Sequence, residues 1–369
     1  MFSYWEKRES ERPFDILIIG GGITGYSAAI ECKMYRPDIR VGLLEKSNFE
    51  TTASTKNAGF ACFGSITEML GDLKRLSEDD FCDLVRNRWE GLRLLRQRAG
   101  DQHMRFNECG GYEVFRSKEE YEKAASSIAK LNNLLRSIVG PEIFRDVIDQ
   151  GNFQFEGVHG MIVNRYEGQL DPARMMARLR QLARGLDVEY YTAEAMNVEE
   201  RIYDVKVNVG QNDLIASQVV IAVNGLASKF LDLDVKPARA QVLITEPIEE
   251  LGWQGTFHYD EGYYYFRNVG ERVLLGGGRN LDFAGEETTS LDTTSTIQVA
   301  LEKLLSEVII PNREFKIDRR WAGTMGVGPV KEPIVKHVSE RVISAVRLGG
   351  MGVAIGSLVG SRAAHLAVG

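Results

Sequence analysis

Short apolar runs alternate with longer amphipathic stretches along most of this chain. The first run, residues 15–19, is rich in branched side chains, as a buried parallel strand requires. A helical pattern over 23–35 follows it and ends at Arg36-Pro37, and a second apolar run covers 40–44. A strand, a helix and a strand in this order predict a βαβ unit at the start of the chain.

Later patterns predict more of both kinds of element. Leucines at helical spacing indicate amphipathic helices over 68–100 and 117–139, and Asp171-Pro172 begins a helix that ends at Gly185. Apolar or alternating runs predict strands at 188–192, 204–209, 218–223, 241–245, 262–267, 272–276 and 342–346. A final helical run extends through Leu366. We therefore expect an α/β fold, with a Rossmann-like sheet completed by distant segments and a second, mostly antiparallel β-sheet domain that carries helices.

A glycine pattern follows the first strand and indicates what the βαβ unit binds. Gly20, Gly22 and Gly25 have the G-x-G-x-x-G spacing, which allows a tight turn, close approach of a pyrophosphate, and packing of helix on strand. Glu45 ends the second strand, where its carboxylate would accept hydrogen bonds from ribose hydroxyls and repel a 2′-phosphate. The unit therefore predicts a dinucleotide other than NADP.

Composition excludes several other functions. The chain has 369 residues, 44% hydrophobic and 26% charged, as in soluble globular proteins, and its net charge of −7 argues against nucleic acid or an anionic membrane as main partner. No apolar run has membrane-spanning length, and the charged N-terminus lacks the apolar region of a signal peptide. We expect a cytoplasmic protein with a small-molecule substrate. Its oligomeric state is left open.

The cysteines and histidines predict neither a metal site nor a disulfide framework. Cys32, Cys62, Cys82 and Cys109 form no C-x-x-C pair, and the five histidines lack H-x-x-x-H spacing. Cys62 is interpreted as a small buried filler. No G-x-S-x-G elbow supports serine hydrolase chemistry.

Four segments together resemble one family. The N-terminal glycine motif, the loop 53–59, the strand 220–225 and the terminal Gly349-Gly-Met-Gly352 are similar to those of the D-amino-acid-oxidase-like flavoproteins, which include glycine, sarcosine and γ-glutamylputrescine oxidases. The matches cover nearly the whole chain in the family's order. The resemblance implies noncovalent FAD, bound by a discontinuous domain of residues 1–85, 155–232 and 322–369. Residues 86–154 and 233–321 would form the substrate domain.

The resemblance also implies which residues contact the cofactor. The glycine motif would face the pyrophosphate, Glu45 the adenosine ribose, the loop 53–59 the flavin and ribityl chain, and the amides after Gly349 the pyrimidine edge of the flavin. The residues implied as cofactor contacts are Gly20, Gly22, Ile23, Thr24, Gly25, Glu45, Lys46, Ser54, Thr55, Lys56, Asn57, Ala58, Gly59, Ala222, Asn224, Gly225, Trp321, Gly323, Gly350, Met351, Gly352, Val353 and Ala354.

In this family a neutral amine gives a hydride from its α-carbon to flavin N5, and the resulting imine is hydrolysed by water. The candidate catalytic residues are Tyr264, Arg267 and Met351. Tyr264 matches an active-site tyrosine by position, and Arg267 could pair with a substrate carboxylate. Strand alternation sets these two side chains on opposite faces, so both reach the flavin only if a bulge intervenes. Each also has an ordinary packing interpretation.

Three departures from sarcosine-oxidase-like members limit what the resemblance implies. No cysteine near Trp321 would hold FAD covalently, and no lysine in 273–276 would speed reaction with oxygen. Ala354 stands where a carboxylate-binding lysine would fall. The electron acceptor and the substrate anchor are therefore open. A nicotinamide-dependent dehydrogenase and a flavin-binding protein without turnover of small amines stay as alternatives.

Overall fold

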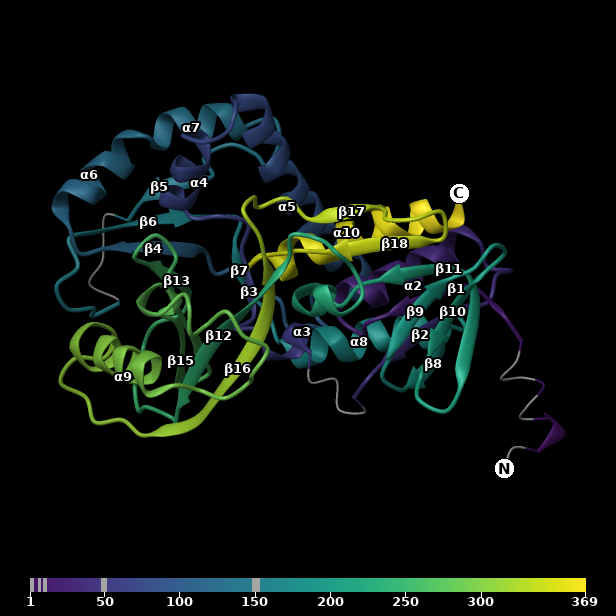
Figure 1. Ribbon diagram of the computed structural model, residues 1–369. Coiled ribbons are helices and arrows are strands. Elements are labelled where there is room, and N and C mark those ends of the chain that lie inside the picture. Colours follow the sequence, from purple (N-terminus) through teal and green to yellow (C-terminus); the bar gives the residue numbers. More distant parts are fainter. Residues whose placement is uncertain (1–2, 6–7, 9–11, 48–51, 148–152) are drawn as a thin grey trace.

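The computed structural model describes residues 3–5, 8, 12–47, 52–147 and 153–369, and every structural statement below concerns these residues. Two large sheets lie side by side, and the C-terminus lies near the first of them (Figure 1). A small sheet pairs β3 (Phe60–Ala61) with β7 (Gly168–Gln169).

The first sheet is built around β1 and is mostly parallel. Its strands are β1 (Phe14–Ile19), β2 (Val41–Glu45), β8 (Glu189–Thr192), β9 (Asn197–Glu200), β10 (Val205–Asn208), β11 (Asp213–Ile221), β17 (Ile334–His337) and β18 (Val342–Val346). Strands β18, β11, β1, β2 and β8 are parallel neighbours in that order. Strands β10 and β17 add antiparallel edges. Because β11 and β18 come late in the chain, the sheet is completed by distant segments, as predicted.

Helices lie against both sheets and connect them. The helices are α2 (Ile23–Tyr35), α3 (Ala53–Lys56), α4 (Ile66–Leu73), α5 (Glu78–Ala99), α6 (Lys118–Ser126), α7 (Ile128–Leu135), α8 (Pro172–Gly185), α9 (Ser295–Leu304) and α10 (Gly352–Val368), with shorter turns η1 (Asn224–Lys229), η2 (Arg279–Leu281) and η3 (Leu305–Ile309). Helix α10 lies against α2 and α5. A Cβ at Gly360 would lie 2.5 Å from the Thr24 carbonyl oxygen, so glycine allows this close packing.

Two helices predicted from periodicity are each divided in the structure. The stretch 68–100 contains α4 and α5, and 117–139 contains α6 and α7. A new helix begins after Ser77 because its hydroxyl oxygen accepts the Asp80 amide at 3.1 Å, an N-cap within an otherwise continuous periodic pattern. Helix α8 has the predicted bounds, with Asp171 accepting the Arg174 amide.

The second sheet is mostly antiparallel. Its strands are, in spatial order, β16 (Ile317–Val327), β12 (Lys236–Thr245), β15 (Arg272–Gly277), β14 (Tyr264–Val269), β13 (Thr256–Tyr259), β4 (Gly111–Phe115), β6 (Gly160–Asn164) and β5 (Phe144–Asp146). Only the β13–β4 pair among them is parallel. Helix α9 packs on one face through the apolar cluster that contains Phe257, Phe266 and Ile297. The predicted α/β fold with a second antiparallel sheet is confirmed.

The domain boundaries expected from the sequence stay a proposal. Strand β6 (residues 160–164), assigned above to the cofactor domain, pairs with β4 in the second sheet. Strand β16 pairs with β12 along residues 317–327, across the expected boundary at 322. Both segments therefore join the second sheet by hydrogen bonding. Among the described residues, no helix is both long and apolar enough to cross a bilayer.

Candidate cofactor site

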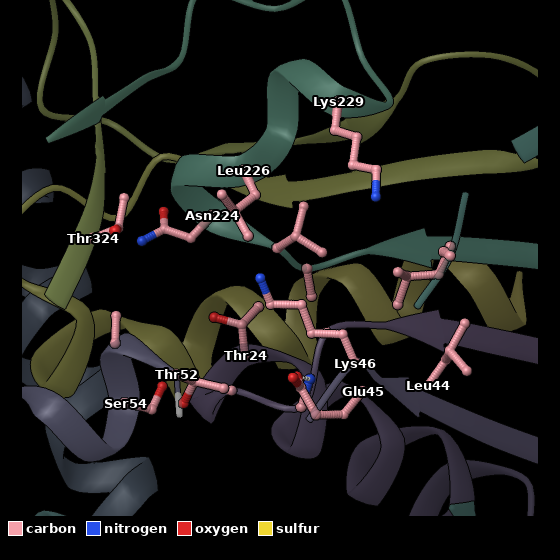
Figure 2. Close-up of a pocket in the computed structure, with 18 of the residues that line it drawn as sticks. Thr24, Leu44, Glu45, Lys46, Thr52, Ser54, Asn224, Leu226, Lys229 and Thr324 are labelled. Carbon is pink, nitrogen blue, oxygen red and sulfur yellow. Dashed lines mark hydrogen bonds between the residues drawn. The ribbon is translucent and has the colours of Figure 1, made fainter. Parts of the chain in front are cut away.

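A cavity lies at the carboxyl ends of the parallel strands. It is lined by residues that directly follow β1, β2, β8 and β11, and it contains about 1110 Å³ of empty space, part of it open solvent. Figure 2 shows its lining side chains. In open α/β sheets, ligands bind at this edge, where strand connections diverge to opposite sides. The cavity is therefore where the predicted dinucleotide belongs.

The glycine turn forms one wall of the cavity, and each motif glycine has a steric reason. Gly20 has φ +113°, and a Cβ there would lie 2.6 Å from the Ala222 carbonyl oxygen. A Cβ at Gly25 would lie 1.8 Å from the Gly20 carbonyl oxygen, so α2 could not pack so closely on the turn. Gly22 is the N-cap of α2 and has no side-chain cap of its own. The turn thus leaves backbone N–H groups at a helix N-terminus, a suitable site for a diphosphate.

Glu45 connects the end of β2 to this turn. Its Oε2 accepts the Gly21 amide at 2.8 Å, and its Oε1 accepts the Ser47 amide at 3.2 Å. The side chain is buried, but a carboxylate has about four acceptor positions and two are used here. Glu45 therefore retains acceptor positions for the hydrogen bond of a ribose hydroxyl.

Ser54 connects the loop of α3 to the start of α2. Its Oγ accepts the Ile23 amide at 2.9 Å, although the two residues are 31 positions apart. This contact replaces the missing local cap of α2 and holds the loop against the turn. The two segments that the resemblance assigned to the cofactor are thus in direct contact.

Cations and unpaired hydroxyls complete the cavity. The ammonium groups of Lys46 and Lys229 reach into it (Figure 2), and Lys229 is 2.7 Å from the Glu194 carboxylate. The Oγ1 atoms of Thr24 and Thr52 are buried and have no hydrogen-bond partner among the described residues. Buried hydroxyls are normally paired, so two orphans beside cations fit a polar, anionic ligand such as the diphosphate.

The other end of the cavity is formed by α3, β16 and the chain before α10. The Trp321 indole N–H donates to the Lys56 carbonyl at 2.8 Å, which ties β16 to α3. Burial lowers the pKa of Lys56. Asn224 adopts φ +47°, and its Oδ1 accepts the Leu348 amide at 3.0 Å, which joins the end of β11 to the segment before α10. Three distant segments therefore close this end.

The predicted cofactor residues separate into two groups. Those that line the cavity are Gly20, Gly22, Ile23, Thr24, Glu45, Lys46, Ser54, Lys56, Ala222 and Asn224. The others support it from behind: Gly25 under the turn, Gly225 against the Met325 carbonyl, Gly323 beside Lys56, and Asn57, whose side chain bonds the backbone of Ser54 and Gly59. Ala58 and Trp321 belong to one apolar cluster, and Thr55 Oγ1 donates to the Thr52 carbonyl.

The predicted C-terminal contacts lie outside the lining. Leu348, directly before them, lines the cavity. Met351 is the N-cap of α10 and packs against the main apolar core. Val353 and Ala354 are buried in the first turn of α10, and the Ala354 carbonyl would lie 2.3 Å from a Cβ at Gly91 of α5. Roles for Gly350 to Ala354 toward a flavin stay a prediction.

The two candidate anchors on β14 lie on opposite faces, and no bulge brings them together. Tyr264 belongs to the cluster on the α9 face, whereas Tyr265 packs with Phe60 and Trp321 on the face toward α3. Arg267 shares the face of Tyr265, and its Nη1 donates to the carbonyls of Gly59 and Leu170 at 3.1 and 2.9 Å. The structure therefore brings Arg267, and not Tyr264, to the loop that carries Gly59. Neither residue lines the cavity itself.

Several lining residues were missed in the sequence. Ala193 and Glu194 follow β8, Leu226 and Lys229 lie in η1 after β11, and Thr324 lies on β16. The first four follow parallel strands that were predicted, so the rule that ligands bind at carboxyl ends could have identified them. Thr324 gave no such signal, because it reaches the site only through the pairing of β16 with β12.

Comparison with known proteins identifies the type of cofactor. The family model DAO, described as FAD dependent oxidoreductase, matches residues 15–366. Probable oxidoreductase OrdL of Rhizobium meliloti (strain 1021) is 22% identical over 407 residues, covering 100% of this chain and 88% of that protein. L-2-hydroxyglutarate dehydrogenase of Escherichia coli O17:K52:H18 is 25% identical over 222 residues, covering 59% of this chain and 49% of that protein.

Solved structures share the fold. L-proline dehydrogenase from P. horikoshii aligns with a TM-score of 0.78 and 16% identity, covering 96% of this chain and 93% of that one. Glycine oxidase from Geobacillus kaustophilus aligns with a TM-score of 0.74 and 19% identity, covering 96% and 94%. The expected family and FAD are thus confirmed, and the nicotinamide alternative is wrong because the matched family is FAD-dependent.

Proposed function

Because this chain belongs to the DAO family of FAD-dependent oxidoreductases, we propose that it oxidises an α-amino acid, or a related amine with a carboxylate, at the α-carbon. The solved neighbours whose names include proline dehydrogenase and glycine oxidase support an amino-acid substrate. Bound FAD supplies the acceptor for the hydride and its electron pair. The resulting imine would be hydrolysed by water.

The observation that carries this proposal is the buried guanidinium group of Arg267. The side chain is buried, only 6% exposed, and within the described residues its hydrogen bonds go to backbone carbonyls and not to a carboxylate. Its Nη1 donates to two backbone carbonyls, its Nε is buried without a partner in the described part of the chain, and burial lowers its pKa to about 10. A buried cation without a counter-ion is costly, so a substrate carboxylate is a fitting partner.

Position and neighbours agree with this role. Arg267 holds the carbonyl of Gly59, in the loop that continues from α3, and α3 lines the cofactor cavity. Tyr265, two residues earlier on the same face, is surrounded by Phe60 and Trp321, and burial raises its pKa to about 12. The carboxylate would therefore bind in an apolar environment, where charge-assisted hydrogen bonds are strong.

A second candidate substrate is a 2-hydroxy acid. The relative named L-2-hydroxyglutarate dehydrogenase supports it, since that protein's name specifies a hydroxyl in place of the amine. Such a substrate carries the same carboxylate and the same α-hydrogen, so the Arg267 argument applies equally. The two candidates differ only in the group on the α-carbon.

Anaerobic reduction of the flavin tests both candidates. The purified protein is mixed with L- and D-amino acids, N-methyl amino acids, 2-hydroxy acids, and amines that lack a carboxylate, and loss of flavin absorbance is followed. We expect reduction by amino acids and none by their decarboxylated analogues. Bleaching by hydroxy acids alone would select the second candidate. Bleaching by none would support a flavin protein without turnover of small amines.

Substitution of Arg267 tests the anchor. Arg267→Met should raise KM for the reducing substrate about 10- to 100-fold, because a charge-assisted hydrogen bond contributes about 1.5–3 kcal/mol. Arg272→Met is the matched control, since this strand neighbour is bonded to Asp318 at the protein edge. Equal KM values for the two variants would contradict the proposed anchor. FAD content, measured in each variant, separates loss of substrate binding from loss of the fold.

A further inference from the structure

Three potential metal ligands meet between the two sheets, outside the cofactor cavity. One ligand atom each of Cys62, Glu167 and His258 lies within 4.8 Å of the other two. Cys62 follows β3 directly, Glu167 precedes β7, and His258 lies on β13. Cys62 and Glu167 are 5% and 0% exposed, and His258 is partly buried, with its Nε2 atom out of contact with solvent.

Two polar atoms of this group lack partners. Glu167 Oε1 accepts the amides of Phe63 and Gly64 at 2.7 and 2.9 Å, but within the described chain its Oε2 is buried without a partner. The Nε2 of His258 is buried and equally unpartnered there. Buried polar atoms are normally satisfied, so two orphans in one cluster indicate a missing bound species.

The backbone of β4 packs closely against the unpaired oxygen. A Cβ at Gly111 would lie 2.0 Å from Glu167 Oε2, so glycine at this position lets the carboxylate lie against the strand. The thiol of Cys62 lies 3.6 Å from Thr256 Oγ1 and 3.9 Å from the Gly168 carbonyl oxygen. These are weak contacts for sulfur, and the thiol also faces the carboxyl group of Glu167, with which it shares a hydrogen bond.

We propose that Cys62, Glu167 and His258 bind one divalent transition-metal ion, for which Zn²⁺ is the best match. Sulfur, nitrogen and oxygen donors together suit Zn²⁺ and do not suit Mg²⁺ or Ca²⁺, which prefer oxygen ligands alone. A thiolate and a carboxylate would balance the two positive charges, so the buried site would be neutral. Three protein ligands leave one tetrahedral position for water or Thr256.

The ion would add a bond between the small sheet of β3 and β7 and strand β13 of the antiparallel sheet, which already meet through the ring contact of Phe60 with His258. This inference is independent of the proposed substrate, since it requires neither Arg267 nor FAD chemistry. The sequence predicted no metal site because its ligands are about a hundred residues apart in the chain, at positions 62, 167 and 258.

Metal content tests the site directly. Holoprotein is treated with a chelator, dialysed against Zn²⁺, freed of excess metal, and analysed by inductively coupled plasma mass spectrometry. We expect one tightly held zinc ion per chain in the wild type and in Cys82→Ser, a partly exposed cysteine outside the cluster. Cys62→Ser, Glu167→Gln and His258→Gln should each bind zinc at least about tenfold more weakly. FAD content and circular dichroism confirm that each variant is folded.

A measurement on the wild type alone guards against misfolded variants. X-ray absorption at the zinc edge should show one sulfur at about 2.3 Å and nitrogen or oxygen ligands at about 2.0–2.1 Å. Zinc without a sulfur ligand, or equal retention by Cys62→Ser and Cys82→Ser, would overturn the proposal. So would a wild type that retains no zinc, in which case a buried water alone satisfies Glu167 and His258.

Discussion

The glycine turn after β1 and the polar face of the antiparallel sheet are built in different ways. The turn consists of neighbouring residues whose contacts are mainly backbone, such as Gly25 against the Gly20 carbonyl. The polar face consists of Glu113, His258, Tyr265 and Arg267, which the pairing of β4, β13 and β14 sets side by side. The first fixes the position of a cofactor by shape, and the second relies on buried ionisable side chains.

This difference explains which parts of the site can be predicted from patterns in the sequence. A turn made of consecutive residues has a spacing that can be read, whereas side chains gathered by strand pairing have none. It also implies different sensitivities. The turn should fail on any added side-chain atom, and the polar face should respond to pH and to removal of single polar groups.

Gly25→Ala should have the largest effect, because its Cβ would lie 1.8 Å from the Gly20 carbonyl oxygen and neither backbone can yield without moving α2. We expect a loss of about 3 kcal/mol or more in the free energy of unfolding and no retained flavin. Urea unfolding and the flavin absorbance of the purified protein measure both. The control is Gly71→Ala in α4, where a Cβ meets nothing within 4 Å and alanine should stabilise by about 0.5–1 kcal/mol. If Gly25→Ala retained flavin as Gly71→Ala does, the steric account of the turn would fail.

Glu113 should give the polar face a pH-dependent stability. Burial raises its pKa from 4.5 to about 7, so the native state keeps a proton that the unfolded chain loses near pH 4.5. Stability should therefore fall as pH rises from about 4.5 to 7, by up to about 3 kcal/mol, and level off above. Glu113→Gln, which cannot titrate, should lose this part of the slope.

Urea unfolding between pH 4.5 and 8, with a chelator present, compares the two proteins. Glu142→Gln is the control, since this carboxylate is exposed and pairs only with Arg165 among the described residues. An unchanged slope in Glu113→Gln would show that the carboxyl group is ionised in the native state at pH 5.

Tyr265 and Tyr264 are adjacent and chemically identical, so they test which face of β14 meets the substrate. Tyr265→Phe should lower kcat/KM about 3- to 10-fold, as expected for loss of one hydrogen bond near the substrate. Tyr264→Phe, on the α9 face, should change kcat/KM less than about twofold. Steady-state kinetics with the substrate found by flavin bleaching measures both. The reverse order of effects would restore Tyr264 as the anchor suggested by family resemblance.

Much of the fold followed from the sequence because its signals are local. The bounds of α2 and α8 and the strand at 342–346 were predicted from periodicity, caps and Pro or Gly positions. Most of the cavity lining at the glycine turn and Glu45 followed in the same way. The orientation of Tyr264 could not be predicted, because alternation gives two faces without saying which one meets α3. Two further features could not be predicted: the meeting of Cys62 with Glu167 and His258, and the lack of a carboxylate partner for Arg267 among the described residues. Both depend on which distant strands pair.

Ser54→Ala should have the smallest effect and tests the point where local and distant structure meet. Its Oγ accepts the Ile23 amide at 2.9 Å and so caps α2 from a separate loop. Loss of an N-cap costs about 1 kcal/mol, so FAD affinity should fall about fivefold while the fold is retained. Thr55→Ala is the matched control, because its hydroxyl donates to the Thr52 carbonyl within the loop. Titration of the deflavinated protein with FAD measures both affinities. A larger loss in Thr55→Ala would mean that the loop's own conformation, and not its cap on α2, sets the affinity of the site.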